Sequence, residues 1–309
     1  AGDSVNAAVR VNATELRARA AAEGGNLGFT QRARIELGLA GGRLNTDAID
    51  NSAGVDTSDH EVNLKIALQP LVAHGALTTD DRNHLLGELA DDVAGLVLEH
   101  NRSQSRAISR DQRRSQTQLV EFREMMTEFE ATGLLDRTLE GLPDRETLRA
   151  RRATFLGLTR PELAVLLAYA KMHVARLLGS DVVCEDPYLE QVLFAYFPPR
   201  LVERCRDAIR VHRLRRELIA TTLTNTIVDL MGTTFVTRTV RESGATAPEV
   251  VRAFVAIEAL TGAQALAARA GEAGPEGEVR YLDTLVAAVE RAVRWLLAAY
   301  PNIGGLEPM

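Results

Sequence analysis

The stretch Gly157-Leu-Thr-Arg-Pro-Glu-Leu-Ala-Val-Leu-Leu-Ala-Tyr-Ala-Lys171 decides the fold class of most of this chain. Thr159 and Glu162 have the spacing of a capping box, in which each side chain bonds the backbone amide of the other residue. Pro161 falls in the first turn, where a helix tolerates a missing amide hydrogen. An almost unbroken apolar run follows. The stretch therefore predicts a helix over residues 160–178.

Helical patterning extends from about residue 58 to the end of the chain. We expect further helix starts at three similar boxes, Ser58-x-x-Glu61, Ser109-x-x-Gln112 and Thr246-x-x-Glu249. The other expected helices span roughly 80–100, 108–131, 144–156, 187–195, 199–213, 214–231, 233–243, 247–269 and 278–299. Breaks are expected at Gly133, Pro143, Gly157, Pro198-Pro199, Gly244 and residues 271–277. This second part of the chain is thus predicted to be almost wholly α.

One apolar stripe marks a buried helix face. Phe122, Met125, Met126 and Phe129 recur at i, i+3, i+4 and i+7, the spacing of one side of a helix. We interpret the stripe as part of the core rather than as a ligand site.

The first 57 residues have a different composition, which is rich in glycine, asparagine and aspartate. Such residues favour loops that join strands to helices. Residues 16–22 and 44–49 are predicted as short strands, and residues 30–40 as a helix ended by Gly41-Gly42, which suit a left-handed cap. The first part of the chain is therefore expected to be α/β.

Composition limits the class of protein. The chain has 309 residues, 46% of them hydrophobic. A chain of this length is expected to form two domains with sizeable cores. A net charge of −6 argues against a general nucleic-acid binder. Two cysteines, Cys184 and Cys205, exclude a disulfide framework and a four-thiolate zinc site. No apolar run has the length of a membrane span, and no signal peptide opens the sequence, so a cytoplasmic, reducing setting is expected.

Common catalytic motifs are absent. The sequence has no HExxH motif, nucleophile elbow, phosphate-binding loop or GxGxxG. The six histidines are scattered and no cysteine–histidine pair has zinc spacing, so no metal site is expected. Asp80-Asp81 is explained by first-turn capping, and Asp91-Asp92 by a solvated helix face. Both cysteines are interpreted as structural thiols.

A basic stripe leaves two interpretations open. Arg102, Arg106, Arg110 and Arg114 recur every four residues and would lie on one helix face. The stripe is either a solvated or ion-paired surface, or a docking face for an acidic partner.

Two segments combine glycines with carboxamides. In Glu23-Gly-Gly-Asn-Leu-Gly-Phe-Thr30, the glycines would let a ligand approach the backbone closely, and the amide of Asn26 matches another carboxamide, such as that of nicotinamide. The second segment, residues 45–58, places Asn51, Val55 and Ser58 before an expected helix start, where free amides favour a carboxylate. The alternatives are a plain turn for the first segment and a simple helix cap for Ser58.

Both segments resemble glutamate dehydrogenases. Hexameric members carry Glu-Gly-Ala-Asn-x-Pro-Thr after a Rossmann strand and then Asn-Ala-Gly-Gly-Val-x-x-Ser; this chain has Glu23-Gly-Gly-Asn26 with Thr30, then Asn51-Ser-Ala-Gly-Val-Asp-Thr-Ser58. It is most similar to the very large bacterial NAD-specific form. That similarity includes residues 25–32, Asn45-Thr-Asp-Ala-Ile-Asp-Asn-Ser-Ala-Gly-Val55, Ser58-Asp-His-Glu-Val-Asn63, residues 157–171, Gly232-Thr-Thr-Phe235 and Arg294-Trp-Leu-Leu297.

The resemblance implies a fold and a set of site residues. The fold would be mainly α: an N-terminal remnant of a Rossmann-like α/β domain, residues 1–69, followed by a large all-α helical domain, residues 70–309. Asn26 and Asn51, with Gly24 and Gly25, would lie beside NAD, and Val55 and Ser58 would bind glutamate. Gly25, Gly28 and Ser52-Ala53 depart from the hexameric pattern, which affects individual contacts rather than the family.

Some family features have no counterpart here. Members use lysines and an aspartate, upstream of these motifs, to hold glutamate and move protons, whereas Lys65 and Lys171 lie in no matching segment. The phosphate-binding glycine loop is also missing. We therefore assign no catalytic residue and expect the chain to be a C-terminal piece of a longer, homo-oligomeric enzyme that oxidises L-glutamate to 2-oxoglutarate with NAD. The alternative is a non-catalytic helical assembly or regulatory domain, and a helical metal-dependent hydrolase comes third.

Overall fold

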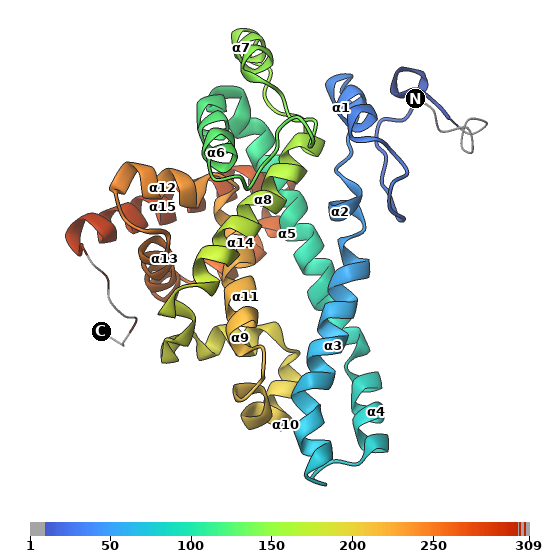
Figure 1. Cartoon of the computed structure of the whole chain (residues 1–309), viewed down its shortest axis with the longest axis vertical. Helices are drawn as coiled ribbons and strands as arrows, with labels where there is room; N and C mark the ends of the chain where they lie inside the picture. Colours follow the sequence, from blue (N-terminus) through green and yellow to red (C-terminus); the bar gives the residue numbers. More distant parts are fainter. Residues whose placement is uncertain (1–9, 302, 304–305, 307–309) are drawn as a thin grey trace. The chain divides into compact units, whose positions relative to one another are not determined.

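The computed structural model describes residues 10–301, 303 and 306, and these are mainly helical (Figure 1). The chain divides into two units of two segments each: unit 1 comprises Ala1–Ser52 and Asp111–Leu166, and unit 2 comprises Ala53–Arg110 and Leu167–Met309. The unit borders fall in or at the ends of three helices, α3 (Ser52–Ala73), α5 (Ala90–Thr117) and α8 (Arg160–Gly179). The expected domain border at residues 69/70 lies within α3 and stays a prediction.

Unit 1 contains little extended structure among its described residues. It holds η2 (Ala13–Glu15), α1 (Gln31–Leu39), α2 (Asp47–Asp50), α6 (Leu119–Ala131) and α7 (Arg145–Ala153). One isolated parallel bridge joins Ala20 to Arg43, through hydrogen bonds of 3.0 Å in each direction. The chain between these two residues passes through α1, so the two bridged positions flank a helix.

The two predicted strands are therefore wrong in this structure. Residues 16–22 pair only around Ala20, because a run rich in alanine has low strand propensity and a two-stranded pairing is marginal. Within residues 44–49, helix α2 begins at Asp47, whose carboxylate suits the positive end of a helix. The helix over 30–40 is confirmed, with Thr30 capping Ala33 and Gly41 at φ 89°.

The apolar stripe lies in the core of unit 1. Phe122, Met125, Met126 and Phe129 on α6 are fully buried, as their spacing predicts. An ion pair also connects two helices in unit 1. Arg151 of α7 donates two hydrogen bonds, 2.7 and 3.0 Å long, to the buried Glu162 of α8. Glu162 also accepts from the Thr159 amide, which confirms that half of the expected capping box. A bidentate pair of this kind fixes the geometry of both side chains.

Gly157 lets two backbone segments of unit 1 pack closely against each other. A Cβ at this position would lie 2.2 Å from the Ser115 hydroxyl and 2.9 Å from the Gln116 amide nitrogen. The same hydroxyl accepts a hydrogen bond from the Leu158 amide. The end of α5 and the segment before α8 therefore pack at glycine distance.

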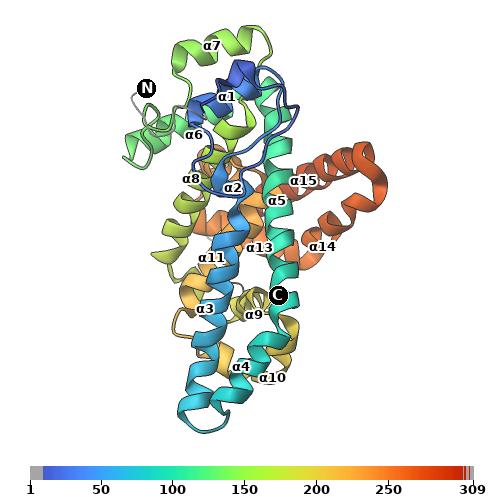
Figure 2. The same cartoon turned by 90° about the vertical axis from the view of Figure 1, so that its right-hand side faces the viewer.

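Unit 2 is helical throughout its described residues. Besides the unit 2 parts of α3, α5 and α8, it contains α4 (Thr79–Glu88), η3 (Val182–Glu185), η4 (Pro187–Leu189), α9 (Glu190–Tyr196), α10 (Pro199–Arg210), α11 (Arg215–Met231), α12 (Phe235–Ser243), α13 (Ala247–Thr261), α14 (Ala263–Ala268), η5 (Arg269–Ala273) and α15 (Gly274–Ala299). Helices α3, α4 and α5 follow one another so that α5 returns alongside α3 (Figures 1 and 2). The central helix α11 packs against α9, α12, α14 and α15.

Several expected helix borders need correction. Ser58 and Ser109 do not start helices, because they lie within α3 and α5, and their hydroxyls donate to the carbonyls of Val55 and Ser105. Each matches the box spacing inside a helix, where such side chains bond backwards to a carbonyl. The expected helices 80–100 and 108–131 break instead at Leu89 and Gln118, and the helix 247–269 breaks at Gly262 (φ 60°).

Among the described residues, no single helix has the length and apolarity to cross a membrane. The pair Ala247–Thr261 and Ala263–Glu272 passes that test together, with a bend of 68° between its two helices.

Replacing Gly157 with alanine should destabilise the protein. The new methyl would overlap the Ser115 hydroxyl, and overpacking of this kind costs about 1–3 kcal/mol. The matched control is Gly95→Ala within α5, where a Cβ meets no atom within 4 Å. That change should add about 0.4–1 kcal/mol of stability. Urea unfolding of both variants checks the prediction, and equal effects would contradict it.

The capping box of α13 should make stability depend on pH. The Glu249 carboxylate accepts from the Thr246 amide (2.7 Å) and hydroxyl (2.8 Å), and these bonds lower the pKa of Glu249. The stabilisation is therefore present above the unfolded pKa and lost as the pH falls through the lower folded pKa. Thr246→Ala should cost about 1 kcal/mol at neutral pH.

Urea unfolding of the Thr246 variant at neutral pH and at steps down to about pH 3 provides the measurement, since the carboxylate gains its proton progressively as the pH falls. The difference from wild type should shrink in acid. Thr261→Ala, which removes an uncharged hydroxyl bond to Ile257 in the same helix, is the control and should show no such change. A pH-independent loss at Thr246 would contradict the role of Glu249.

Candidate functional site

The loop at residues 23–30 is held by a buried carboxylate. Glu23 is 6% exposed and accepts hydrogen bonds from Arg34 Nε (2.7 Å), Arg34 Nη2 (2.9 Å) and the Phe29 amide (2.9 Å). Its own amide donates to Asp50. Arg34 sits on the inner face of α1, so the helix positions the loop that precedes it. Sequence reasoning did not identify Arg34 as a partner of this loop.

A second carboxylate shapes the tip of the same loop. Asp47 accepts from the Leu27 amide (3.0 Å) and pairs with Arg34 (3.3 Å). Leu27 has φ 63°, a conformation that few non-glycine residues adopt. Burial acts to raise the pKa of Asp47, but the hydrogen bonds and the Arg34 charge lower it on balance. The loop is therefore fixed at both ends by charge-assisted bonds.

These contacts bring the two predicted carboxamides together. Asn51 Nδ2 donates to Asn26 Oδ1 over 3.3 Å, although the residues are 25 apart in sequence. Asn26 is exposed and Asn51 is half-buried, so both amides remain accessible. Two neighbouring carboxamides supply donors and acceptors on one surface, which suits an amide-bearing or hydroxyl-bearing ligand.

The glycines beside Asn26 leave space. A Cβ at Gly24 or Gly25 would meet no atom within 4 Å, and neither residue has positive φ. Local packing therefore does not require glycine at these two positions. Gly28 differs, since its Cβ would lie 3.3 Å from the Glu23 carboxylate.

Val55 and Ser58 lie on the first two turns of α3. Both are exposed, Val55 by 73%. The predicted helix start at Ser58 is wrong, because α3 begins six residues earlier, at Ser52, and the Ser58 hydroxyl donates to the Val55 carbonyl over 2.8 Å. Ser58 therefore lies inside α3 rather than at its start. A ligand role for Val55 and Ser58 stays a prediction.

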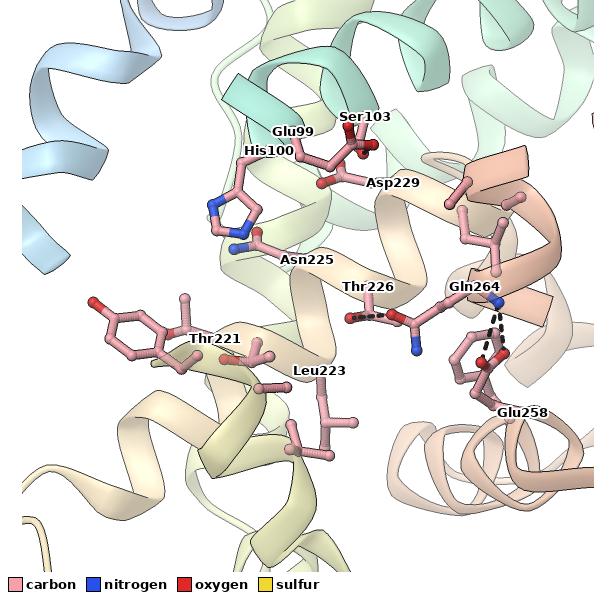
Figure 3. Close-up of a pocket in the computed structure, with 18 of the residues that line it drawn as sticks. Glu99, His100, Ser103, Thr221, Leu223, Asn225, Thr226, Asp229, Glu258 and Gln264 are labelled. Carbon is pink, nitrogen blue, oxygen red and sulfur yellow. Dashed lines mark hydrogen bonds between the residues drawn. The ribbon is translucent and has the colours of Figure 1, made fainter. Parts of the chain in front are cut away.

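Unit 2 encloses a cavity of about 610 Å³ between α3, α5, α9, α11, α13 and α14. Figure 3 shows His100, Asn225, Thr226 and Gln264 directed into the same space. Its acidic lining groups are Asp56, Asp59, Glu99, Asp229 and Glu258. Burial raises the pKa of Asp229, which lies 2.8 Å from Lys171 Nζ, and burial likewise raises the pKa of Glu258. The lining also contains Arg106 and Arg110, so the cavity presents groups of both charges.

At one end of this cavity, the lining residues Asp56 and His100 lie beside the buried His60. Asp56 and His60 are one turn apart on α3, and His100 Nδ1 lies 2.8 Å from Asp56 Oδ2. Burial lowers the pKa of His60, with Asp56 opposing that effect and the nearby His100 reinforcing it. Sequence reasoning regarded the histidines as scattered and missed this group. The signal was Asp56-x-x-x-His60, whose spacing places both side chains on one helix face.

Three other interpretations can be compared with the structure. The arginine stripe is ion-paired: Arg102 contacts Glu99, Arg106 contacts Glu99 and Glu278, Arg110 contacts Asp283, and Arg114 contacts Asp111 and Glu121. These bonds favour a paired surface over a docking face.

Burial raises the pKa of Cys184 to about 11 and also raises that of Cys205, as structural thiols require. Thr78 caps the helix that carries Asp80-Asp81 in its first turn, which confirms that interpretation.

Comparison with known proteins identifies the family. Residues 1–111 match the model described as "Bacterial NAD-glutamate dehydrogenase, catalytic domain", and residues 156–303 match "Glutamate dehydrogenase, C-terminal". The chain belongs to the bacterial NAD-glutamate dehydrogenases. Asn26, Asn51, Val55 and Ser58 all fall within the catalytic-domain match, as do Asp56, His60 and His100.

Three relatives carry the name NAD-specific glutamate dehydrogenase. The chain is 46% identical to the Pseudomonas aeruginosa protein over 256 residues, 44% to the Halomonas elongata protein over 255 and 39% to the Mycobacterium tuberculosis protein over 305. These alignments cover 83%, 82% and 97% of this chain but only 16%, 16% and 19% of the relatives. The chain thus spans less than a fifth of the length of these family members.

Proposed function

We propose that this chain works as part of a longer NAD-dependent glutamate dehydrogenase, which converts L-glutamate to 2-oxoglutarate and ammonia. The observation that carries the proposal is the pairing of Asn26 with Asn51, in a segment that matches the catalytic-domain model of the family. The names of the relatives support the same reaction.

The cofactor residues of the proposal are Asn26, Asn51, Gly24 and Gly25. They fit one end of NAD, because the two amides are accessible and the glycines leave open space above the backbone. Bound NAD would accept the hydride released from the glutamate α-carbon. The Glu23–Arg34 pair would keep the amide of Asn26 in position against it. Val55 and Ser58 are the proposed glutamate-binding residues.

Proton transfer is assigned to residues outside this chain. Lys65 pairs with Glu61 on the surface of α3, and Lys171 pairs with the buried Asp229. Neither lysine lies in a segment that matches the catalytic motifs of the family. This assignment supports a division of labour in which the rest of the enzyme supplies the base.

The remaining parts of the proposal concern organisation. Residues 1–69 are assigned to the distal part of an NAD-binding domain with Rossmann-like ancestry, and residues 70–309 to the helical domain. Homo-oligomeric assembly and a cytoplasmic location belong to the same proposal. Static light scattering of the longer polypeptide tests the assembly.

The first prediction concerns turnover. NAD reduction with L-glutamate should be detected for the longer reading frame that contains this chain, and not for the 309-residue chain alone. The assay follows absorbance of reduced NAD on both proteins at matched concentration. Turnover by the short chain would contradict the proposal, and a folded long protein without activity would favour the non-catalytic helical domain.

Replacing Ser58 with alanine separates substrate binding from stability. Among the described residues, the Ser58 hydroxyl bonds only to the Val55 carbonyl of its own helix, so its loss should leave the unfolding midpoint almost unchanged. In the longer enzyme, Ser58→Ala should raise KM for glutamate several-fold and leave KM for NAD unchanged. Thr57→Ala, the exposed neighbour on α3, is the control. An unchanged glutamate KM would remove Ser58 from the site.

A further inference from the structure

His60 is a buried imidazole without a hydrogen bond. Its side chain is fully buried, and within the described part of the chain neither Nδ1 nor Nε2 has a hydrogen-bond partner. It is stacked on Tyr196, with ring centroids 4.4 Å apart, and faces His100 at 5.8 Å. Leaving polar nitrogens unsatisfied in a core costs free energy, so such a group calls for an explanation.

The potential metal-ligand atoms around His60 suggest an explanation for its missing hydrogen bonds. His60 Nε2 lies 3.7 Å from Asp56 Oδ1, beyond hydrogen-bond length, and His100 Nδ1 lies 2.8 Å from Asp56 Oδ2. One donor atom from each of the three residues falls within 4.8 Å of the other two. Metal–ligand bonds of about 2.0–2.2 Å in a tetrahedral site hold their donors about 3.3 Å apart. The observed separations bracket that value.

We propose that Asp56, His60 and His100 bind a divalent transition-metal ion of the Zn²⁺ type. Two imidazoles and one carboxylate suit Zn²⁺ or Fe²⁺, whereas Mg²⁺ and Ca²⁺ prefer oxygen ligands alone. The ion would bind one of the two nitrogens of His60 and join the parts of α3 and α5 that lie in unit 2.

The surroundings give the ion one open position. Asp56 and His100 line the cavity of about 610 Å³, whereas His60 approaches from the protein interior. Three protein ligands leave a fourth position for water or a small anion, and this position faces the cavity. Two other carboxylates of the lining have basic partners, Glu99 with Arg102 and Asp229 with Lys171, so Asp56 supplies the negative charge of the site. Tyr196, whose hydroxyl donates to Asp59 over 2.7 Å, holds the face of the His60 ring.

The test uses the purified chain after removal of metal with a chelator. Titration calorimetry with ZnCl₂ should give one ion per chain, and Co²⁺ should give visible absorption bands of a site with nitrogen ligands. Zn²⁺ should also raise the thermal unfolding midpoint, because an ion that binds only the folded state stabilises it. His60→Gln and His100→Gln should each lose the ion and the shift in midpoint.

Two features keep the result interpretable. His100 is 39% exposed at its side chain, so the His100 variant should fold even if the His60 variant does not, as circular dichroism will report. The control is His84→Gln: His84 also lies one turn from a carboxylate, Glu88, at 3.2 Å, but on the surface of α4. It should retain the ion. Failure to bind Zn²⁺ or Co²⁺, or binding that survives in the His100 variant, would overturn the proposal.

Discussion

The candidate cofactor surface depends on one buried ion pair, that of Arg34 with Glu23. Loop 23–30 has three glycines and no secondary structure of its own, so its shape must come from side-chain bonds. The guanidinium fork of Arg34 binds both oxygens of Glu23 and also contacts Asp47. A lysine could not make this bidentate bond. Without it, the loop would lose the constraint that holds Asn26 beside Asn51.

Arginine pairs have the same role elsewhere in the chain. Arg151 with Glu162 in unit 1, and Arg238 with Glu290 in unit 2, are further short pairs with a buried arginine. These pairs mainly fix the positions of their side chains, because desolvation offsets much of the attraction between buried charges. The sequence has 34 arginines and two lysines, and the stripe on α5 shows where many of them are used. Sequence spacing could not distinguish a paired stripe from a docking face, since the partners Glu278 and Asp283 lie far along the chain.

Local signals predicted the helices well where they were punctuated by glycine, proline or a true capping box. The helix ended by Gly41-Gly42, the helix 160–178 and the box at Thr246 all follow such signals. The two false capping boxes share a cause. Ser58-x-x-Glu61 and Ser109-x-x-Gln112 match the box pattern, but the residues before them also form helix, so the serines bond backwards. The strands failed for other reasons, since alanine gives residues 16–22 a low strand propensity and helix α2 begins within residues 44–49.

The histidine group shows the limit of sequence reasoning most clearly. The spacing of Asp56 and His60 predicts that they share one helix face, but His100 reaches them only because α5 returns along α3. On the same helix, Val55 and Ser58 point elsewhere: at 100° per residue, their mean direction is about 150° from that of Asp56 and His60. One side of α3 can therefore hold an ion in unit 2 while Val55 and Ser58 stay exposed on another side. An ion on the inner side would fix the rotation of α3 about its axis, and with it the direction in which Val55 and Ser58 face.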